Sequence, residues 1–189
     1  MFIHQLPQST VCQMVEDSSV RSEFRVQLDS VNGFSEADFA KLKAASCLME
    51  SVIRSEEFRE HVYAFTWEGG DKFADNRGLS NVQIYEMLQE GREAYSDDAD
   101  QVANLRLKLY SPPFFKRWGV VGYGFAGDPM IFINKNYFHI FSLAEVAGNF
   151  AHEWCHKLGF EHDFRRTAKR PYSVPYGIGK IVTDLALKY

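Results

Sequence analysis

Apolar and polar residues alternate in two segments of the chain and recur at helical spacing in a segment between them. The alternation begins at Glu23 and again at Asn104, and it predicts strands with one buried face. Ser35 is a good N-cap residue, and the positions after it predict a helix over about residues 35–55. The apolar positions of this helix, spaced by three or four, are Phe39, Leu42, Ala45, Leu48, Met49 and Val52.

Shorter apolar runs between turn residues predict the remaining elements. Strands are expected at residues 61–67, 119–125 and 130–138, and a helix capped by Ser80 or Asn81 is expected after the first of these strands. The order is strand, helix, strand, helix, three strands and a final histidine-containing helix. This order predicts an α/β or α+β sheet with helices behind it.

Composition allows one folded domain and excludes some partners. The chain has 189 residues, of which 46% are hydrophobic, so we predict a single domain over residues 1–189. The net charge is -4, and the short basic cluster RRTAKR at residues 165–170 is too small for a nucleic-acid footprint. We expect a monomer without a nucleic-acid partner.

The cysteines and the N-terminus bear on the compartment. The chain has three cysteines, an odd number at wide spacing, which does not suggest a disulfide framework and suits a reducing compartment. No apolar run approaches the roughly 20 residues that span a bilayer. The first residues lack the basic start and apolar run of a secretory signal. We therefore expect no membrane partner, and either a cytoplasmic location or export by a signal-independent route.

The last predicted helix carries the candidate chemistry. Ser142 and Glu145 form an S-x-x-E capping box at its start. At about 100° per residue, its apolar residues share one face, and His152 and His156 lie one turn apart on the opposite face. Two imidazoles at this spacing can bind one ion, at about 2.0–2.1 Å each if the ion is zinc. Gly159 can then take a positive φ and reverse the chain.

The reversal after Gly159 allows His162 to return as a third ligand. The stretch therefore has the pattern H-E-x-x-H-x-x-G-x-x-H-D. H-E-x-x-H alone is expected by chance in on the order of one in a hundred chains of this length, and the extended pattern in on the order of one in 10⁵. Glu153 lies beside the ligands and close to where a bound water would sit. The alternative is a histidine-rich surface helix or an inactive remnant of a site.

From His152 to Asp163 the chain resembles the metzincin clan of zinc metallopeptidases. The resemblance implies an α+β fold with a mixed, mostly parallel twisted sheet, a backing helix and an active-site helix. It also implies an upper subdomain over about residues 20–158 and a minimal lower one over about 159–189. Metzincins bind an extended peptide antiparallel to an edge strand, and the candidates here are within residues 118–125 or 130–138.

The resemblance also implies the roles of the site residues. His152, His156 and His162 would bind Zn²⁺ and leave one position for water, whose pKa the metal lowers. Glu153 would take the proton of the attacking water and pass it to the leaving amine. Asp163 matches an acidic residue that supports the site in the adamalysin-like branch without binding the metal.

The chain departs from the metzincin pattern after the third histidine. Metzincins have a methionine-containing turn under the metal, but the last methionine here is Met130. We expect residues 172–180 in that place, with Pro175 at the turn, Val174 or Pro175 as the apolar floor, and a closing helix at residues 180–189. Tyr176 could ligate zinc or stabilise the oxyanion, as a tyrosine does in astacins. The alternative is that Tyr176, like the weaker candidate Tyr172, only packs.

These observations predict a zinc-dependent endopeptidase that acts on peptides or proteins. One alternative is a catalytically inactive zinc-binding or peptide-binding module of the same fold, and another is a zinc hydrolase of a non-peptide substrate. Asn149, one turn before His152, is a candidate to support the site. Cys155 is expected to be a small buried side chain rather than a redox-sensitive thiol. Cys12 could cap the zinc as a cysteine switch, although only its position suggests this.

Overall fold

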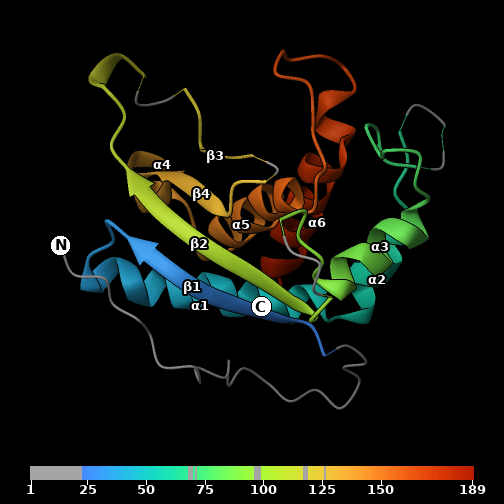
Figure 1. Ribbon diagram of the computed structural model, residues 1–189, viewed down its shortest axis with the longest axis horizontal. Coiled ribbons are helices and arrows are strands. Elements are labelled where there is room, and N and C mark those ends of the chain that lie inside the picture. The colour runs from blue at the N-terminus through green and yellow to red at the C-terminus, as the bar shows by residue number, and fades with distance from the viewer. Residues whose placement is uncertain (1–22, 68–69, 71, 96–98, 117–118, 126) are drawn as a thin grey trace.

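The computed structural model describes residues 23–67, 70, 72–95, 99–116, 119–125 and 127–189. Its sheet has four strands in the order β1-β2-β4-β3. β1, β2 and β4 run parallel to one another, and β3 pairs antiparallel with β4 at the edge (Figure 1). The strands are β1 (Arg25–Asn32), β2 (Val102–Tyr110), β3 (Gly122–Gly124) and β4 (Met130–Asn134).

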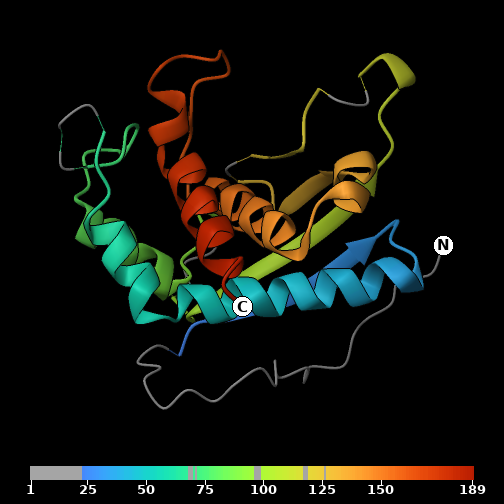
Figure 2. The ribbon, with the colours of Figure 1, turned by 180° about the vertical axis from the view of Figure 1, so that it is seen from behind.

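Helices cover one face of this sheet, as the view from behind shows (Figure 2). The helical elements are α1 (Glu36–Ile53), α2 (Glu56–Tyr63), α3 (Asn81–Glu90), η1 (Phe114–Lys116), α4 (Lys135–Ile140), α5 (Leu143–Lys157), η2 (Arg170–Tyr172) and α6 (Val174–Ala186). The pattern of β2 explains why one face is covered, because its leucines are buried while Arg106 and Lys108 are exposed. Helices and a mixed, mostly parallel sheet together make an α+β architecture, as the sequence predicted.

The long helix α1 begins where its sequence predicted. The Ser35 hydroxyl accepts a hydrogen bond from the backbone N–H of Asp38 at 3.2 Å, and the Asp38 carboxylate accepts one from the backbone N–H of Ser35 at 3.0 Å. This reciprocal capping satisfies two backbone donors that the first turn of a helix leaves without partners. α1 packs behind the sheet and contacts both α5 and α6.

The strand predicted at residues 61–67 was wrong, because residues 56–63 form helix α2. Ser55 caps this helix by accepting from the backbone N–H of Phe58 at 3.1 Å. The buried residues Phe58 and Val62 are one helical turn apart, and this spacing outweighs the local alternation of apolar and aromatic residues.

The two strands that flank the predicted AGDP turn are shorter than expected. Within residues 119–125 only Gly122–Gly124 forms a strand, β3. The strand predicted at residues 130–138 ends at Asn134, whose side chain accepts from the backbone N–H of Asn136 at 3.0 Å and begins α4. Apolar residues occur on both sides of the change from strand to helix, and Phe138 of α4 is buried like the residues of β4. Hydrophobicity alone therefore did not reveal where the strand ends.

The closing helix begins earlier than predicted. α6 starts at Val174 instead of residue 180, and Pro175 lies in its first turn instead of forming a turn between elements. Proline suits that position because the first N–H groups of a helix have no intrahelical partner. Val174 and Pro175 are both buried, so the segment predicted to be a turn forms the start of a packed helix.

The cysteines correct one expectation and confirm another. Cys47, on α1, is disulfide-bonded, whereas no disulfide was expected from the sequence, because spacing along the chain does not reveal which cysteines meet in space. Cys155 is a free thiol and is fully buried, as predicted. Cys12 lies outside the described residues. Within the described ranges, no helix combines the length and the apolar character needed to cross a membrane.

Candidate metal centre

Helix α5 begins with the predicted capping box. The Glu145 carboxylate accepts from the backbone N–H of Ser142 at 2.7 Å, and the Ser142 hydroxyl accepts from the backbone N–H of Glu145 at 3.3 Å. Phe150, Ala151 and Trp154 are fully buried, so the helix packs its apolar face into the core.

The chain reverses at the end of α5, as expected from the glycine at position 159. Gly159 has a φ of 85°, and its N–H donates to the carbonyl of His156 at 3.0 Å. The N–H of Phe160 donates to the carbonyl of Cys155 at 3.1 Å. A residue with a side chain rarely adopts this backbone conformation, so glycine favours the reversal that brings His162 back to the helix.

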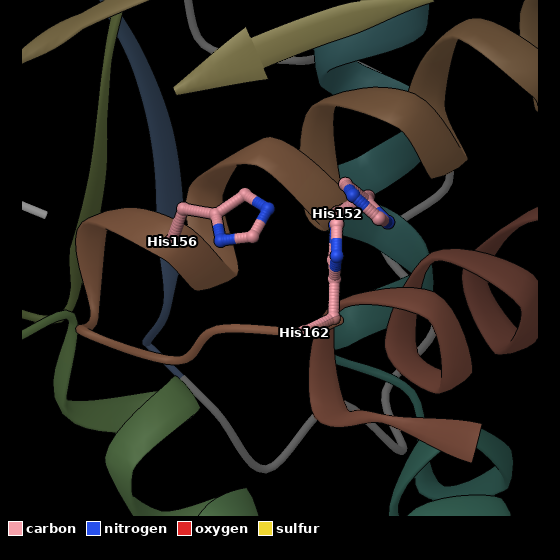
Figure 3. Close-up of side chains that lie close together, drawn as sticks. All are labelled: His152, His156 and His162. Atoms are coloured by element: carbon pink, nitrogen blue, oxygen red, sulfur yellow. The ribbon is translucent and has the colours of Figure 1, made fainter. Parts of the chain in front are cut away.

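The three predicted ligands meet beside α5. Ring centroids lie 5.2 Å apart for His152 and His156, 5.3 Å for His152 and His162, and 4.9 Å for His156 and His162 (Figure 3). One ring nitrogen from each lies within 4.8 Å of the others. Three nitrogens bound tetrahedrally to one zinc ion are about 3.3 Å apart, so the rings need to close by at most about 1.5 Å.

Backbone carbonyls orient the three rings. Nδ1 of His156 lies 2.7 Å from the carbonyl of Phe160, and Nδ1 of His162 lies 3.1 Å from the carbonyl of Asp163. His152 makes a hydrogen bond with the backbone of Pro175, which can only accept. A carbonyl only accepts hydrogen bonds, so each bonded nitrogen carries the proton and the other keeps its lone pair for a metal.

Electrostatics also favours metal binding by these rings. Burial lowers the pKa of His156 to about 4, and burial is likewise the main cause of the lowered pKa of His152 and of His162. Neutral imidazoles are the form that binds zinc. Three neutral imidazoles with anchored rings and convergent nitrogens therefore fit a zinc ion.

Glu153 is a buried carboxyl beside the histidines. Only 2% of its surface is exposed, and burial raises its pKa to about 8, against the opposing effects of the Lys157 charge and a hydrogen bond with Asn149. Its Oε2 is buried and has no hydrogen-bond partner among the described residues. An added Cβ at Gly122 would lie 2.9 Å from Oε1 of Glu153, so β3 passes directly beside the carboxyl.

Lys157 was missed by sequence reasoning. It is fully buried, and its ammonium group donates to the carbonyl of Phe125 at 3.2 Å, to that of Met130 at 2.7 Å and to that of Asp128. Three acceptors match the three N–H donors of a lysine. Lys157 thereby ties both ends of the β3–β4 connection to α5. The sign in the sequence was that Lys157, at helical spacing from Phe150 and Trp154, falls on the apolar face of the helix.

Tyr176 lies beside the histidines, as the sequence suggested. Its ring centroid is 4.5 Å from that of His152 and 4.8 Å from that of His162. Arg170, which sequence reasoning did not select, donates from Nη2 to the Tyr176 hydroxyl at 2.5 Å. Tyr172 packs instead against Phe65, with ring centroids 6.4 Å apart, and does not line the cleft.

Close contact between α5 and α6 brings Tyr176 to the histidines. An added Cβ at Gly148 would lie 1.9 Å from Oγ1 of Thr183 and 2.6 Å from the carbonyl oxygen of Gly179. The backbones therefore approach through glycine on both helices. Tyr176, one turn before Gly179, then falls beside His152, which is one turn after Gly148. Sequence reasoning did not foresee this crossing, although both glycines could have suggested it.

The two supporting residues proposed from sequence contact the site differently. Asn149 hydrogen-bonds to the Glu153 carboxylate, in line with its position on the histidine face. Asp163 contacts His162 through its backbone carbonyl, while its carboxylate accepts from Thr167 at 2.6 Å and lies 3.6 Å from the ammonium of Lys169. The Asp163 side chain therefore organises the loop that carries His162, while its backbone carbonyl makes the hydrogen bond with the ring.

The histidines open into a cleft of about 880 Å³. One wall is the chain from Gly119 to Phe125, which includes the edge strand β3. The opposite side includes Tyr176, Gly179 and Thr183 of α6. Of the two candidate edge segments, residues 118–125 contain the edge strand β3. Residue 118 lies outside the described residues. β4 is interior, between β2 and β3.

Comparison of the chain with family models, with curated proteins and with solved structures finds no match to any of them.

Proposed function

We propose that this chain is a zinc-dependent endopeptidase with a metzincin-like architecture. The observation that carries the proposal is the convergence of three neutral, carbonyl-anchored imidazoles beside a buried carboxyl group. His152, His156 and His162 would hold the ion. When bound, zinc would act as a Lewis acid that polarises the scissile carbonyl and activates water.

Glu153 would be the general base and acid. Its carboxylate would accept the proton of the attacking water and then deliver that proton to the nitrogen of the leaving amine. A pKa raised to about 8 by burial suits a group that must both take and give a proton near neutral pH. The Tyr176 hydroxyl would donate a hydrogen bond to the oxygen of the scissile carbonyl as negative charge develops there.

The edge strand β3 would bind the substrate backbone. Its outer side is unpaired among the described strands, and an extended peptide can add to such an edge through backbone hydrogen bonds. Because Gly122 lies next to the Glu153 carboxyl, a peptide paired with β3 would pass close to the general base and the histidines. An open edge of this kind favours a peptide over a small non-peptide substrate.

The buried carboxyl argues against the inactive-module alternative. Burying a carboxyl group without a partner for Oε2 costs free energy, and binding a metal through three histidines does not need that group. A role in proton transfer accounts for keeping it in that place.

Hydrolysis of casein tests the proposal. The protein is assayed as purified, after removal of metal with a chelator, and after zinc is added back, and mass spectrometry identifies the bonds cut. We expect cleavage at internal bonds that disappears with chelation and returns with zinc. Cleavage that persists without metal would contradict the zinc mechanism, and cleavage only at chain ends would contradict an endopeptidase.

A further inference from the structure

Arg170 connects the two segments that flank the histidines. Its Nη1 donates to the carbonyl of Phe164, in the loop after His162, at 3.1 Å. Its Nη2 donates to the hydroxyl of Tyr176 on α6 at 2.5 Å, and its guanidinium carbon lies 4.9 Å from the centre of the Tyr176 ring. Two hydrogen bonds and a ring contact therefore fix the position of the guanidinium.

The charge of Arg170 has no acidic partner among the described residues. None of the ion pairs between described residues includes Arg170, and its Nε–H is buried without a hydrogen-bond partner among those residues. Its guanidinium stacks at the Tyr176 ring, whose centre lies only 4.5 Å from that of the His152 ring. The positive charge of Arg170 would repel a metal dication bound by the histidines. The same charge would stabilise an anion, or a developing negative charge, beside that metal.

Hydrogen-bond donation by Arg170 determines what the Tyr176 hydroxyl can do. A phenolic oxygen that accepts from a guanidinium has one hydrogen left, and that hydrogen must be directed away from the guanidinium. A charged donor also polarises the hydroxyl and makes it a stronger donor to a third group. The rings of His152 and His162 lie 4.5 Å and 4.8 Å from that of Tyr176, so the phenol stands beside both histidines.

We infer that Arg170 is a positioning residue that acts through Tyr176: it fixes the phenol so that the hydroxyl hydrogen is donated to the oxyanion formed at the scissile carbonyl. This inference rests on the proposed peptidase function. The competing role is that of a direct anchor for a substrate carboxylate, which would not need Tyr176 and would depend on the charge of the substrate.

A double-mutant cycle tests the inference with Arg170→Met, Tyr176→Phe and the double variant. The substrate is a quenched fluorogenic peptide built on the bond that the wild type cuts fastest in casein. We expect Arg170→Met to lower kcat about tenfold in the wild type but less than about twofold in Tyr176→Phe, with KM changed less than about threefold in both. Arg170→Lys should restore part of the loss. Equal losses in both backgrounds would overturn the inference, as would a rise in KM confined to acidic peptides.

A second measurement does not depend on catalysis. Calorimetry gives the Kd of inorganic phosphate, a tetrahedral anion, for each zinc-loaded variant. We expect Arg170→Met to weaken phosphate binding about tenfold when Tyr176 is present and less than about twofold when Tyr176 is Phe. An equal loss in both backgrounds would mean that Arg170 acts directly on the anion, and no loss in either would mean that it does not act on the anion at all; each result overturns the inference.

Arg166→Met is the matched control for charge, since Arg166 also lines the cleft but is an exposed residue of the preceding loop. Its effect should be the same with Tyr176 and with Phe at that position. Zinc content and thermal unfolding of every variant exclude loss of the fold. If phosphate binding shows the coupling and no peptide is cut, the peptidase proposal fails and the Arg170–Tyr176 pair stands. If peptide is cut without coupling, the peptidase proposal stands and the pair fails.

Discussion

Helices α5 and α6 form two sides of one cleft, but they position their functional residues in different ways. On α5, His152 and His156 are one turn apart, and a glycine reversal at the end of the helix brings His162 beside them within a short segment. On α6, the N-cap residue Ser173 makes no side-chain capping bond, and Tyr176 reaches the histidines because the two helices approach at Gly148 and Gly179. Local spacing thus determines where the three histidines lie, whereas packing between distant segments determines the wall of the cleft that faces them.

This difference predicts two classes of variant. Changes on α5 that remove a ligand should remove the metal together with the activity. Changes on α6, or at its contact with α5, should leave the metal bound and lower the rate. Zinc content measured beside activity separates the two classes.

The largest effect is expected for His156→Ala. It removes one of three ligands and leaves the protein unable to hold zinc tightly, so both zinc content and casein hydrolysis should fall to background. His139→Ala is the matched control, because His139 is a histidine of α4 that pairs with Asp38 at 2.9 Å outside the cleft. The control should keep both zinc and activity. Full activity in His156→Ala would show that this histidine is not a ligand.

The next largest effect is expected for Tyr176→Phe. Removing one donor to an oxyanion lowers kcat about 10²-fold, while the ring that packs on His152 is retained. Zinc content should stay at the wild-type level. Tyr172→Phe, which changes a tyrosine that packs against Phe65, should have wild-type kcat. Equal kcat values for the two variants would mean that Tyr176 only packs.

A smaller effect is expected where α5 and α6 touch. Gly148→Ala places a methyl group against Thr183, so it should lower the free energy of unfolding by about 1–3 kcal/mol. By moving Tyr176 away from His152, it should also lower kcat about tenfold. Urea unfolding and steady-state kinetics measure the two effects. The additional change Thr183→Ala removes the closest clash and should recover part of both, and an unchanged kcat in Gly148→Ala would contradict the role of the crossing.

The smallest effect on the chemical step is expected for Lys157→Met. It leaves three carbonyls of the β3–β4 connection without their donor, so the free energy of unfolding should fall by about 1–3 kcal/mol. If β3 binds the substrate backbone, KM should rise more than kcat falls. Lys188→Met, which loses only an exposed ion pair with Glu57, is the control and should match the wild type. A fall in kcat alone would place Lys157 in the chemical step.

The sequence predicted what depends on neighbouring residues. The N-cap at Ser35, the capping box at Ser142, the histidine spacing and the reversal at Gly159 each involve positions at most four apart, and the structure contains all of them. Apart from the place of Tyr176 beside the histidines, contacts between distant segments were not predicted. The hydrogen bonds of Arg170 and of Lys157 with backbone carbonyls were found only in the structure, because hydrogen bonds to the backbone leave no pattern in the sequence. The earlier start of α6 depends on the burial of Val174 and Pro175, which packing determines.

The most direct test of the proposed zinc mechanism compares the wild type with Glu153→Gln, which keeps the shape of the side chain but cannot accept the proton. Zinc content is measured by mass spectrometry beside hydrolysis of casein. We expect about one zinc per chain in both proteins, with a loss of about 10²–10⁴-fold in activity in the variant alone. Equal hydrolysis by both proteins, or zinc in both without hydrolysis by either, would contradict the proposed endopeptidase mechanism.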